Sequence, residues 1–496
     1  MRNNKTFVPA FKLLTLLAVL PTCIGCASFA REQPGTASSS TSYYAGEAPS
    51  VRNKPQAQAT VEITPELLKK EWGLADIIDL ALKNNPATRS AWLDAKSAAA
   101  RVGVAQAAFY PRASLDGNAS LTYLNRTDID LASRLWKDGA SVSAGYLIYD
   151  FGGRNASEEA AFNTLAAANW TQNRTIQDTI LGTQKAYYLY LASKSLRDTR
   201  IKALERGDLA LKTAQARNAA GVATIADVLS TQTAYSQARL ALETANGAIE
   251  ITRGSLAVAM GLPSNLKFDV EPLPDTTVYR NIEDEVENLI AKALTLRPDL
   301  LAARAQSAAA WSLAKRAELD SMPTISLSAS SGISWLSFND AAVTKTNGDR
   351  REDSFFTGVG ITFPLFTGYA QTYNQKRAKL DAESAEERSK GLEQVAVNQV
   401  FTAYHSLRTA SLKVLVIEDL IKSAVRSEEV AYGRYHEGVG TILDLVTAQA
   451  ALVDARTQAI QARWEWHTAL AQLAHDTGVL DIKGQSSLTE SKAPAK

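Results

Sequence analysis

The chain has 496 residues, enough for two or three ordinary domains or for one elongated domain. Its formal net charge is only +1, so it has no general positive field that would attract nucleic acid or acidic substrates. Both cysteines, Cys23 and Cys26, lie near the start, which excludes a disulfide framework or a cysteine metal cluster from the body of the chain.

The first segment has the pattern of an export signal. Basic residues precede the apolar run at 13–20, which is too short for a stable membrane span; the alternative is a buried N-terminal helix. The tetrapeptide that ends at Cys26 resembles a bacterial lipobox. We therefore expect residues 1–25 to be a lipoprotein signal peptide and Cys26 to carry the N-terminal lipid, palmitate included, with Cys23 as the alternative attachment site. The Ser-, Thr- and Pro-rich stretch 26–60 is expected to be an extended tether.

The rest of the chain contains an internal duplication. An apolar helical pattern is stopped by Pro86, and the same pattern recurs before Pro298. We therefore divide the body into a first repeat at 61–265 and a second repeat at 266–478, followed by a flexible tail at 479–496. The middle of each repeat is rich in Ala, Leu, Gln, Glu, Lys and Arg, a composition typical of long helices.

Each repeat is expected to contain a pair of strands. Apolar and polar residues alternate in four stretches that have the length of a tilted, bilayer-crossing strand. These stretches are about 112–124 and 140–150 in the first repeat and about 324–336 and 354–363 in the second. The polar segments between them, about 125–139 and 337–353, are predicted to be loops. For strands of this kind the alternative is a small soluble β domain.

Each strand pair leads into a very long predicted helix, at about 154–216 and 370–434. At about 1.5 Å per residue, each helix would be roughly 95 Å long. The two shorter predicted helices of each repeat sum to nearly the same length, so one continuous helix would lie against two helices stacked end to end. A long coiled-coil sheath has this arrangement, and a globular domain does not require it.

The two predicted hairpin tips are near-copies, RNAAGVATIADVL at 217–229 and RYHEGVGTILDLV at 434–446. Together with the duplicated proline-to-strand steps and the FGG and FTG motifs at the strand exits, they resemble the TolC family of outer-membrane efflux ducts. The resemblance covers roughly residues 70–478 and occurs twice in the same order. It implies a mainly α fold with a transmembrane β-barrel portion, in which three chains form one twelve-stranded barrel that continues into a periplasmic α-helical coiled-coil barrel.

The resemblance also implies partners and a location. A homotrimer would lie in the bacterial outer membrane, anchored by its lipid, and would extend into the periplasm towards a periplasmic adaptor protein and a proton-driven inner-membrane efflux pump. The channel would conduct its cargo passively, with multidrug resistance as one family role. We expect no nucleic acid partner and no cofactor besides the lipid on Cys26. Within the family, the alternative is the duct of a type I protein secretion system; outside it, the alternative is a lipid-anchored coiled-coil scaffold without a pore.

Several tip residues have roles implied by the same resemblance. Asp227, Tyr435 and Asp444 match residues that close the family's periplasmic gate. The family's gate arginine falls on Gly440, and Arg434 is the substitute that this chain offers. The alternative for both acids is purely structural, because an aspartate in the first turn of a helix favours the helix dipole. The expected adaptor contacts are the small residues of the two tips: Gly221, Val222, Thr224, Gly438, Val439, Gly440 and Thr441.

The sequence contains no convincing catalytic or metal-binding pattern. The four histidines, at positions 405, 436, 467 and 475, do not have metal-ligand spacing, so we expect them to be solvated or packed side chains. No phosphate-binding loop or nucleophile elbow occurs in a suitable context. We therefore predict a channel and not an enzyme.

Overall fold

The computed structural model describes residues 72–126, 131–272, 285–340 and 348–480. All of them belong to one compact unit, Ile63–Lys496. The predicted signal peptide, Cys26, the predicted tether and most of the predicted C-terminal tail lie outside the described residues.

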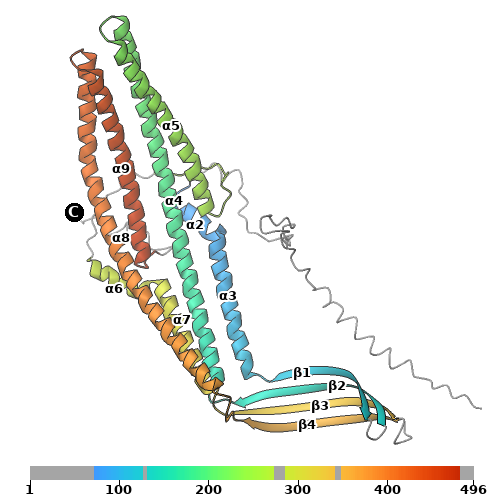
Figure 1. The fold of residues 1–496 in the computed structure, drawn as a ribbon. Coiled ribbons are helices and arrows are strands. Elements are labelled where there is room, and N and C mark those ends of the chain that lie inside the picture. Colours follow the sequence, from blue (N-terminus) through green and yellow to red (C-terminus); the bar gives the residue numbers. More distant parts are fainter. Residues whose placement is uncertain (1–71, 127–130, 273–284, 341–347, 481–496) are drawn as a thin grey trace, which may run out of the picture. The chain divides into compact units, whose positions relative to one another are not determined.

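The described elements occur twice in the same order. The first repeat contains helices α2 (Leu74–Asn84) and α3 (Pro86–Gln106), the short turn η3 (Ala107–Phe109), strands β1 (Arg112–Arg126) and β2 (Leu131–Tyr149), and helices α4 (Gly153–Ala219) and α5 (Ile225–Ala259). The second repeat contains α6 (Val286–Leu296), α7 (Pro298–Leu319), β3 (Thr324–Asp340), β4 (Gly348–Thr362), α8 (Ala370–His436) and α9 (Ile442–Asp476). The four strands lie side by side in one sheet, and the helices form a bundle (Figure 1). The predicted duplication of a strand pair and a long helix is confirmed.

The two long helices, α4 and α8, have 67 residues each. Helix α4 packs against α3 and α5, and α8 packs against α7 and α9 (Figure 1). The predicted arrangement of one continuous helix beside two shorter ones is therefore confirmed. Helix α4 also packs against α7 and α9, so it joins the two repeats. None of the helices in the described part of the chain is both long and apolar enough to cross a bilayer.

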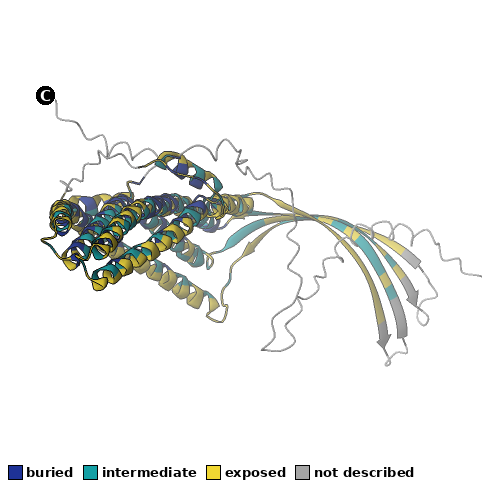
Figure 2. Ribbon diagram, turned by 90° about the horizontal axis from the view of Figure 1, so that it is seen from above, coloured by how far each residue is buried: buried dark blue, intermediate teal, exposed yellow. Residues whose placement is uncertain are grey.

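Small side chains occupy many of the helix contacts. Ala214 on α4 and Ala382 and Ala396 on α8 have no exposed surface, and alanine at such positions lets helix backbones approach closely. Larger side chains fill the core where the short helices α2 and α6 cover the long ones, as Ile77 and Val400 do. Buried residues are accordingly concentrated in the helical part, whereas the sheet is largely exposed (Figure 2).

Proline and glycine define the helix breaks. Pro86 and Pro298 are the first residues of α3 and α7, positions where the missing N–H has no intrahelical partner to lose. The turn after α5 packs onto the first break: Gly261 has φ +72°, and a Cβ on it would lie 2.6 Å from the carbonyl oxygen at the end of α2. Gly478, with φ +76°, packs on Arg297 at the second break in the same way. The last helix of each repeat is therefore fastened to the first break of that repeat.

The sheet has the order β1-β2-β3-β4, and all pairs are antiparallel. The central pair, β2 and β3, joins the two repeats, while β1 and β4 each pair on one side only within the described sheet. The strands are longer than predicted, and much of the segments 125–139 and 337–353, predicted as loops, is strand instead. Polar and charged side chains do not interrupt a ladder of backbone hydrogen bonds, so polarity alone misplaced the strand ends.

Candidate functional site

The sheet has one apolar and one polar face. Directly opposed residues of antiparallel strands project to the same side, and the register places Leu115 opposite Val142 and Leu327 opposite Val359. The apolar face of β3 carries Ile325, Leu327, Ala329, Ile333 and Trp335. The other face of β3 carries Ser326, Ser328, Ser330, Gly332 and Ser334. None of these side chains is buried, so both faces are available to their surroundings.

The apolar face has the height of a membrane core. Ile325 and Trp335 are roughly 33 Å apart along β3 at about 3.3 Å per residue. A strand tilt of about 40° reduces this distance to roughly 25 Å, the height of the apolar band on outer-membrane strands. Aromatic side chains mark both limits, Tyr123, Trp136 and Trp335 towards the hairpin ends and Tyr146, Tyr149 and Phe363 towards the helices. Such paired aromatic girdles are typical of membrane-spanning strands.

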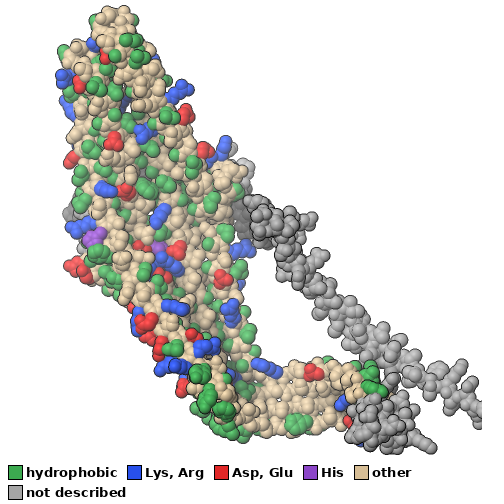
Figure 3. All heavy atoms as spheres, viewed as in Figure 1, with side chains coloured by type: hydrophobic (Ala, Val, Ile, Leu, Met, Phe, Trp, Pro, Cys, Tyr) green, Lys and Arg blue, Asp and Glu red, His purple; other side chains and the backbone are tan. Residues whose placement is uncertain are grey.

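Large apolar side chains also gather where the strands meet the helices (Figure 3). The exposed members of this group include Tyr110, Phe151, Leu365, Phe366 and Tyr369. Exposed apolar groups of this size mark an interaction surface, and aromatic rings suit the boundary between water and lipid.

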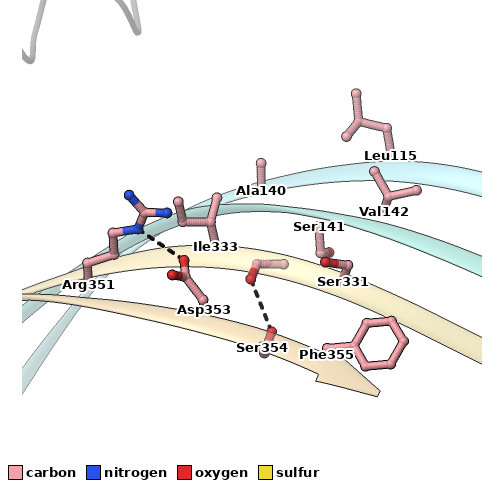
Figure 4. A pocket seen from close by; sticks show the side chains of 11 residues that line it. Leu115, Ala140, Ser141, Val142, Ser331, Ile333, Arg351, Asp353, Ser354 and Phe355 are labelled. Atoms are coloured by element: carbon pink, nitrogen blue, oxygen red, sulfur yellow. Dashed lines mark hydrogen bonds and ion pairs between the residues drawn. The ribbon is translucent and has the colours of Figure 1, made fainter. Parts of the chain in front are cut away.

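Towards the hairpins the apolar face becomes charged. Arg351 and Asp353 of β4 form an ion pair with an Nε–Oδ1 distance of 3.0 Å (Figure 4). A hollow of about 500 Å³ lies beside this pair and reaches Leu115 and Phe355. Its lining comes from all four strands and combines aliphatic, hydroxyl and charged side chains. The hollow therefore extends from the middle of the apolar face to its charged hairpin side, and its lining has no arrangement of groups suited to catalysis.

The second candidate site consists of the two hairpin tips, where each returning helix begins with the same cap. Thr224 Oγ1 accepts the Asp227 N–H at 3.3 Å, and Asp227 Oδ2 accepts the Thr224 N–H at 2.9 Å. Thr441 and Asp444 form the same reciprocal pair at 3.2 and 3.3 Å. The hydrogen bonds from Thr441 hold the pKa of Asp444 below its ordinary value, so this exposed carboxylate is charged at neutral pH. Both predicted gate acids thus have a structural role as helix caps.

Glycine is required in both tip turns. Gly221 and Gly438 have φ values of +74° and +80°, the left-handed region that favours glycine. Gly440 has no space for a side chain, because a Cβ there would lie 2.9 Å from the Cβ of Arg434. The position onto which the family's gate arginine falls therefore cannot hold an arginine in this turn.

The contact between the tips is made by Arg217 in the last turn of α4. Its Nη1 donates to the carbonyl oxygens of Tyr435 at 2.7 Å and of His436 at 3.4 Å. Its guanidinium lies over the Tyr435 ring, 5.1 Å from the centroid. These carbonyls belong to the last turn of α8, where the helix carries partial negative charge. Sequence reasoning matched Arg217 to Arg434 and gave it no role, although Arg217 is the only basic residue in the last turn of α4.

Tyr435 is buried at the tip, and its Oη has no hydrogen-bond partner among the described residues. Burial raises the pKa of Tyr435; Arg217 opposes this rise, and the carboxylate of Asp227 adds to it. The chain therefore brings Tyr435, Arg217 and Asp227 into one neighbourhood. Asp227 bonds to its own helix cap, however, and not to Tyr435.

Both tips expose apolar side chains. Val222 and Val439, two of the predicted adaptor contacts, are 64% and 70% exposed. Further exposed apolar residues follow on α5 and α9: Ile225, Leu229 and Leu443. Apolar residues gathered at the end of a hairpin fit a docking surface better than a solvated turn.

A buried charged network joins the repeats near the end of α9. The side chain of His475 is 4% exposed, and its Nδ1 and Nε2 lie 2.8 Å from Asp476 and 2.7 Å from Asp178 of α4. Because both partners are carboxylates, both ring nitrogens donate and the ring is an imidazolium. Burial would lower the pKa of His475, but the hydrogen bonds to Asp178 and Asp476 outweigh it and raise the pKa. His475 is thus a packed side chain, as predicted, but its two ion pairs were not predicted from the sequence.

The network continues into the second helical break. Arg174 pairs with Asp178 at 3.0 Å and lies 3.9 Å from Asp299. Asp299 pairs in turn with Arg297, whose side chain is 1% exposed and also donates to the backbone carbonyl of Asp476. The network thus links α4, α7 and α9. Nowhere in the described part of the chain do three or more His, Cys, Asp or Glu side chains form a metal-binding group.

Comparison with known proteins gives consistent matches. The family model described as outer membrane efflux protein matches residues 77–262 and 289–479. Protein CyaE of Bordetella pertussis is 28% identical over 81% of this chain and 83% of that protein. The pyoverdine export outer membrane protein OpmQ of Pseudomonas aeruginosa is 25% identical over 70% of this chain and 69% of that protein. The solved structure of the outer-membrane channel OprN superposes with a TM-score of 0.72 at 18% identity, covering 82% of this chain and 89% of that one.

Proposed function

Because this chain belongs to the outer membrane efflux protein family and is an outer-membrane efflux channel, we propose that three copies of it form the conducting unit of a tripartite export system. A periplasmic adaptor and a proton-driven inner-membrane pump complete that system. The pump supplies the energy, and the channel conducts its cargo passively to the cell exterior.

The observation that carries this proposal is the two-faced sheet with two open edges. Strands β1 and β4 each leave one side of the backbone unpaired, and in lipid each unpaired N–H or carbonyl costs several kcal/mol. Pairing β1 of one copy with β4 of the next closes the sheet, and three copies give a barrel of ordinary size. The apolar face then meets lipid, and the serine-rich face lines a wet pore.

Further parts of the proposal concern the anchor and the adaptor. The N-terminal lipid on Cys26 would hold the chain at the membrane as a lipoprotein, with Cys23 as the alternative site. The exposed tip residues Val222 and Val439 would contact the adaptor, together with the neighbouring glycines and threonines. The names of the relatives support both routes, since OpmQ is a pyoverdine export protein and AprF of Pseudomonas aeruginosa is an alkaline protease secretion protein, so type I protein secretion stays the alternative to small-molecule efflux.

The first test measures oligomer mass in detergent and single-channel conductance in a planar bilayer. We expect a particle with the mass of three mature chains, each being the 53.5 kDa precursor without residues 1–25, and a small, cation-selective conductance. A monomer that never conducts would contradict the proposal and favour a lipid-anchored coiled-coil scaffold.

We also propose that the tips form the periplasmic gate, with Asp227, Tyr435 and Asp444 as its residues and Asp444 of three copies as a ring at the constriction. Asp444→Asn is expected to lower cation selectivity several-fold, because three carboxylates leave the pore while the amide oxygen still caps α9. The reversal potential in a salt gradient measures this change. Asp419→Asn is the control, since it removes an exposed carboxylate of α8 that belongs neither to the tips nor to the proposed gate. An unchanged reversal potential for Asp444→Asn would refute the ring.

A further inference from the structure

A basic groove lies where α4, α8 and α9 meet, well away from the sheet and the tips. It encloses about 280 Å³. Helix α4 contributes Asp198 and Lys202, α9 contributes Arg456 and Arg463, and aliphatic side chains of α8 and α9 form the floor. Lys202 stands on the first repeat and the two arginines stand on the second, so the groove spans the contact between the repeats.

The cations that line this groove are unpaired. Among the described residues, Lys202, Arg456 and Arg463 have no carboxylate oxygen within ion-pair distance. Some other cations on the same helices have carboxylate partners, such as Lys194 with Asp269 and Lys413 with Glu465, whereas Arg200 and Arg408 have none among the described residues. The one acid in the lining, Asp198, already bonds to Arg197. The groove therefore presents positive charge that the chain itself does not neutralise.

The positive charge is also concentrated. Arg456 is half-buried, and burial followed by repulsion from the nearby Arg206 lowers its pKa. The buried carboxylate of Glu428 opposes this lowering of the pKa, and it reaches Arg206 only at 3.9 Å. Lys202 and Arg463 are exposed and line the same groove, so an anion bound between the three cations would relieve their mutual repulsion.

We propose that this groove is a binding site for a multiply charged oxyanion, held between Lys202 on α4 and Arg456 and Arg463 on α9. Guanidinium groups present paired N–H donors that match the oxygens of phosphate, sulfate and carboxylate groups, and a lysine adds a mobile point charge. The ligand would bridge the two repeats of one chain. This site does not depend on the proposed trimer or gate, because all its residues come from a single chain.

Isothermal titration calorimetry of the full-length protein in detergent tests the site, with sodium sulfate as the probe and sodium chloride of equal ionic strength as the reference. We expect saturable binding of one sulfate per chain. The double variant Arg456→Gln/Arg463→Gln should weaken this binding at least about tenfold, because it removes two charge-assisted contacts. Arg239→Gln on α5 is the matched control, since Arg239 occupies the position of Arg456 in the first repeat; it should bind sulfate as the parent does.

Thermal unfolding provides a second readout. In chloride alone the double variant should be at least as stable as the parent, because like charges have been removed. Sulfate stabilises most proteins because it is excluded from their surface. The site is therefore supported only if the unfolding temperature of the parent rises saturably with sulfate and that of the double variant does not. A heat of titration equal to the dilution blank, or sulfate binding that survives in the double variant, would overturn the proposal.

Discussion

Arg217→Ala is expected to raise the open fraction of the channel about tenfold, the effect of roughly 1.4 kcal/mol on a two-state equilibrium. The Arg217 side chain donates two hydrogen bonds to the C-terminal carbonyls of α8 and covers the ring of Tyr435. Hydrogen bonds from charged donors contribute about 1.5–3 kcal/mol, and exposure at the tip reduces that figure. If opening moves the two hairpins apart, this contact must break, so its removal favours the open state. Single-channel recording measures the open fraction directly.

The internal duplication supplies the control. Arg434 occupies the position of Arg217 in the second repeat, but among the described residues it donates no hydrogen bond to the other hairpin. Arg434→Ala removes the same charge from the same end of the molecule without breaking a hydrogen bond to the other hairpin, and it also tests Arg434 as the substitute for the family's gate arginine. Equal open fractions for the two variants would contradict a latch at Arg217, and so would an unchanged open fraction for Arg217→Ala.

The sequence predicted the architecture because its signals are local and occur twice. Pro86 and Pro298 stop helices through their own chemistry, and the alternation around Leu115 and Ile325 needs only the period of a strand. Strand ends were harder to predict, because charged residues such as Arg351 remain in the ladder beyond the apolar band. The residue types around Arg351 become polar where the strand leaves the apolar band, but the backbone conformation stays extended there.

The candidate sites were less accessible from sequence. The capping pairs of Asp227 and Asp444 follow from a spacing of three residues, and the tip motif contains them. The bond from Arg217 to the end of α8 joins residues more than two hundred positions apart, and no periodicity encodes it. His475 likewise finds Asp178 only because α4 packs against α9. Contacts between the two repeats depend on how their helices pack together, and the duplication alone does not show which helix faces of the two repeats meet.

His475→Gln is expected to loosen the end of α9 more at pH 5.5 than at pH 9.5. The folded-state pKa of His475 is raised above its ordinary 6.5, so its stabilising contribution is complete below pH 6.5 and disappears as the pH rises through the raised value. The pKa of Asp476 is lowered despite its burial, because His475 and Gln472 bond to it, so its contribution persists above pH 3.8. The network is therefore strongest between those two limits.

Hydrogen exchange of the last amides of α9 measures this effect locally. At pH 5.5, His475→Gln should lower the local free energy of opening by about 2 kcal/mol, which corresponds to roughly thirtyfold faster exchange. This effect is smaller than for a fully buried pair because Asp178 is half exposed. His467→Gln, on the same helix, is the control with the opposite sign. Burial and then the nearby Arg463 lower the pKa of His467 to about 4, so the parent already loses stability there as the pH falls below 6.5. Replacing His467 should therefore lower the local stability of α9 less at pH 5.5 than at pH 9.5. If the two variants showed the same pH dependence, the cause would be a general effect of acid, and the proposed role of the His475 imidazolium in linking the two repeats would be refuted.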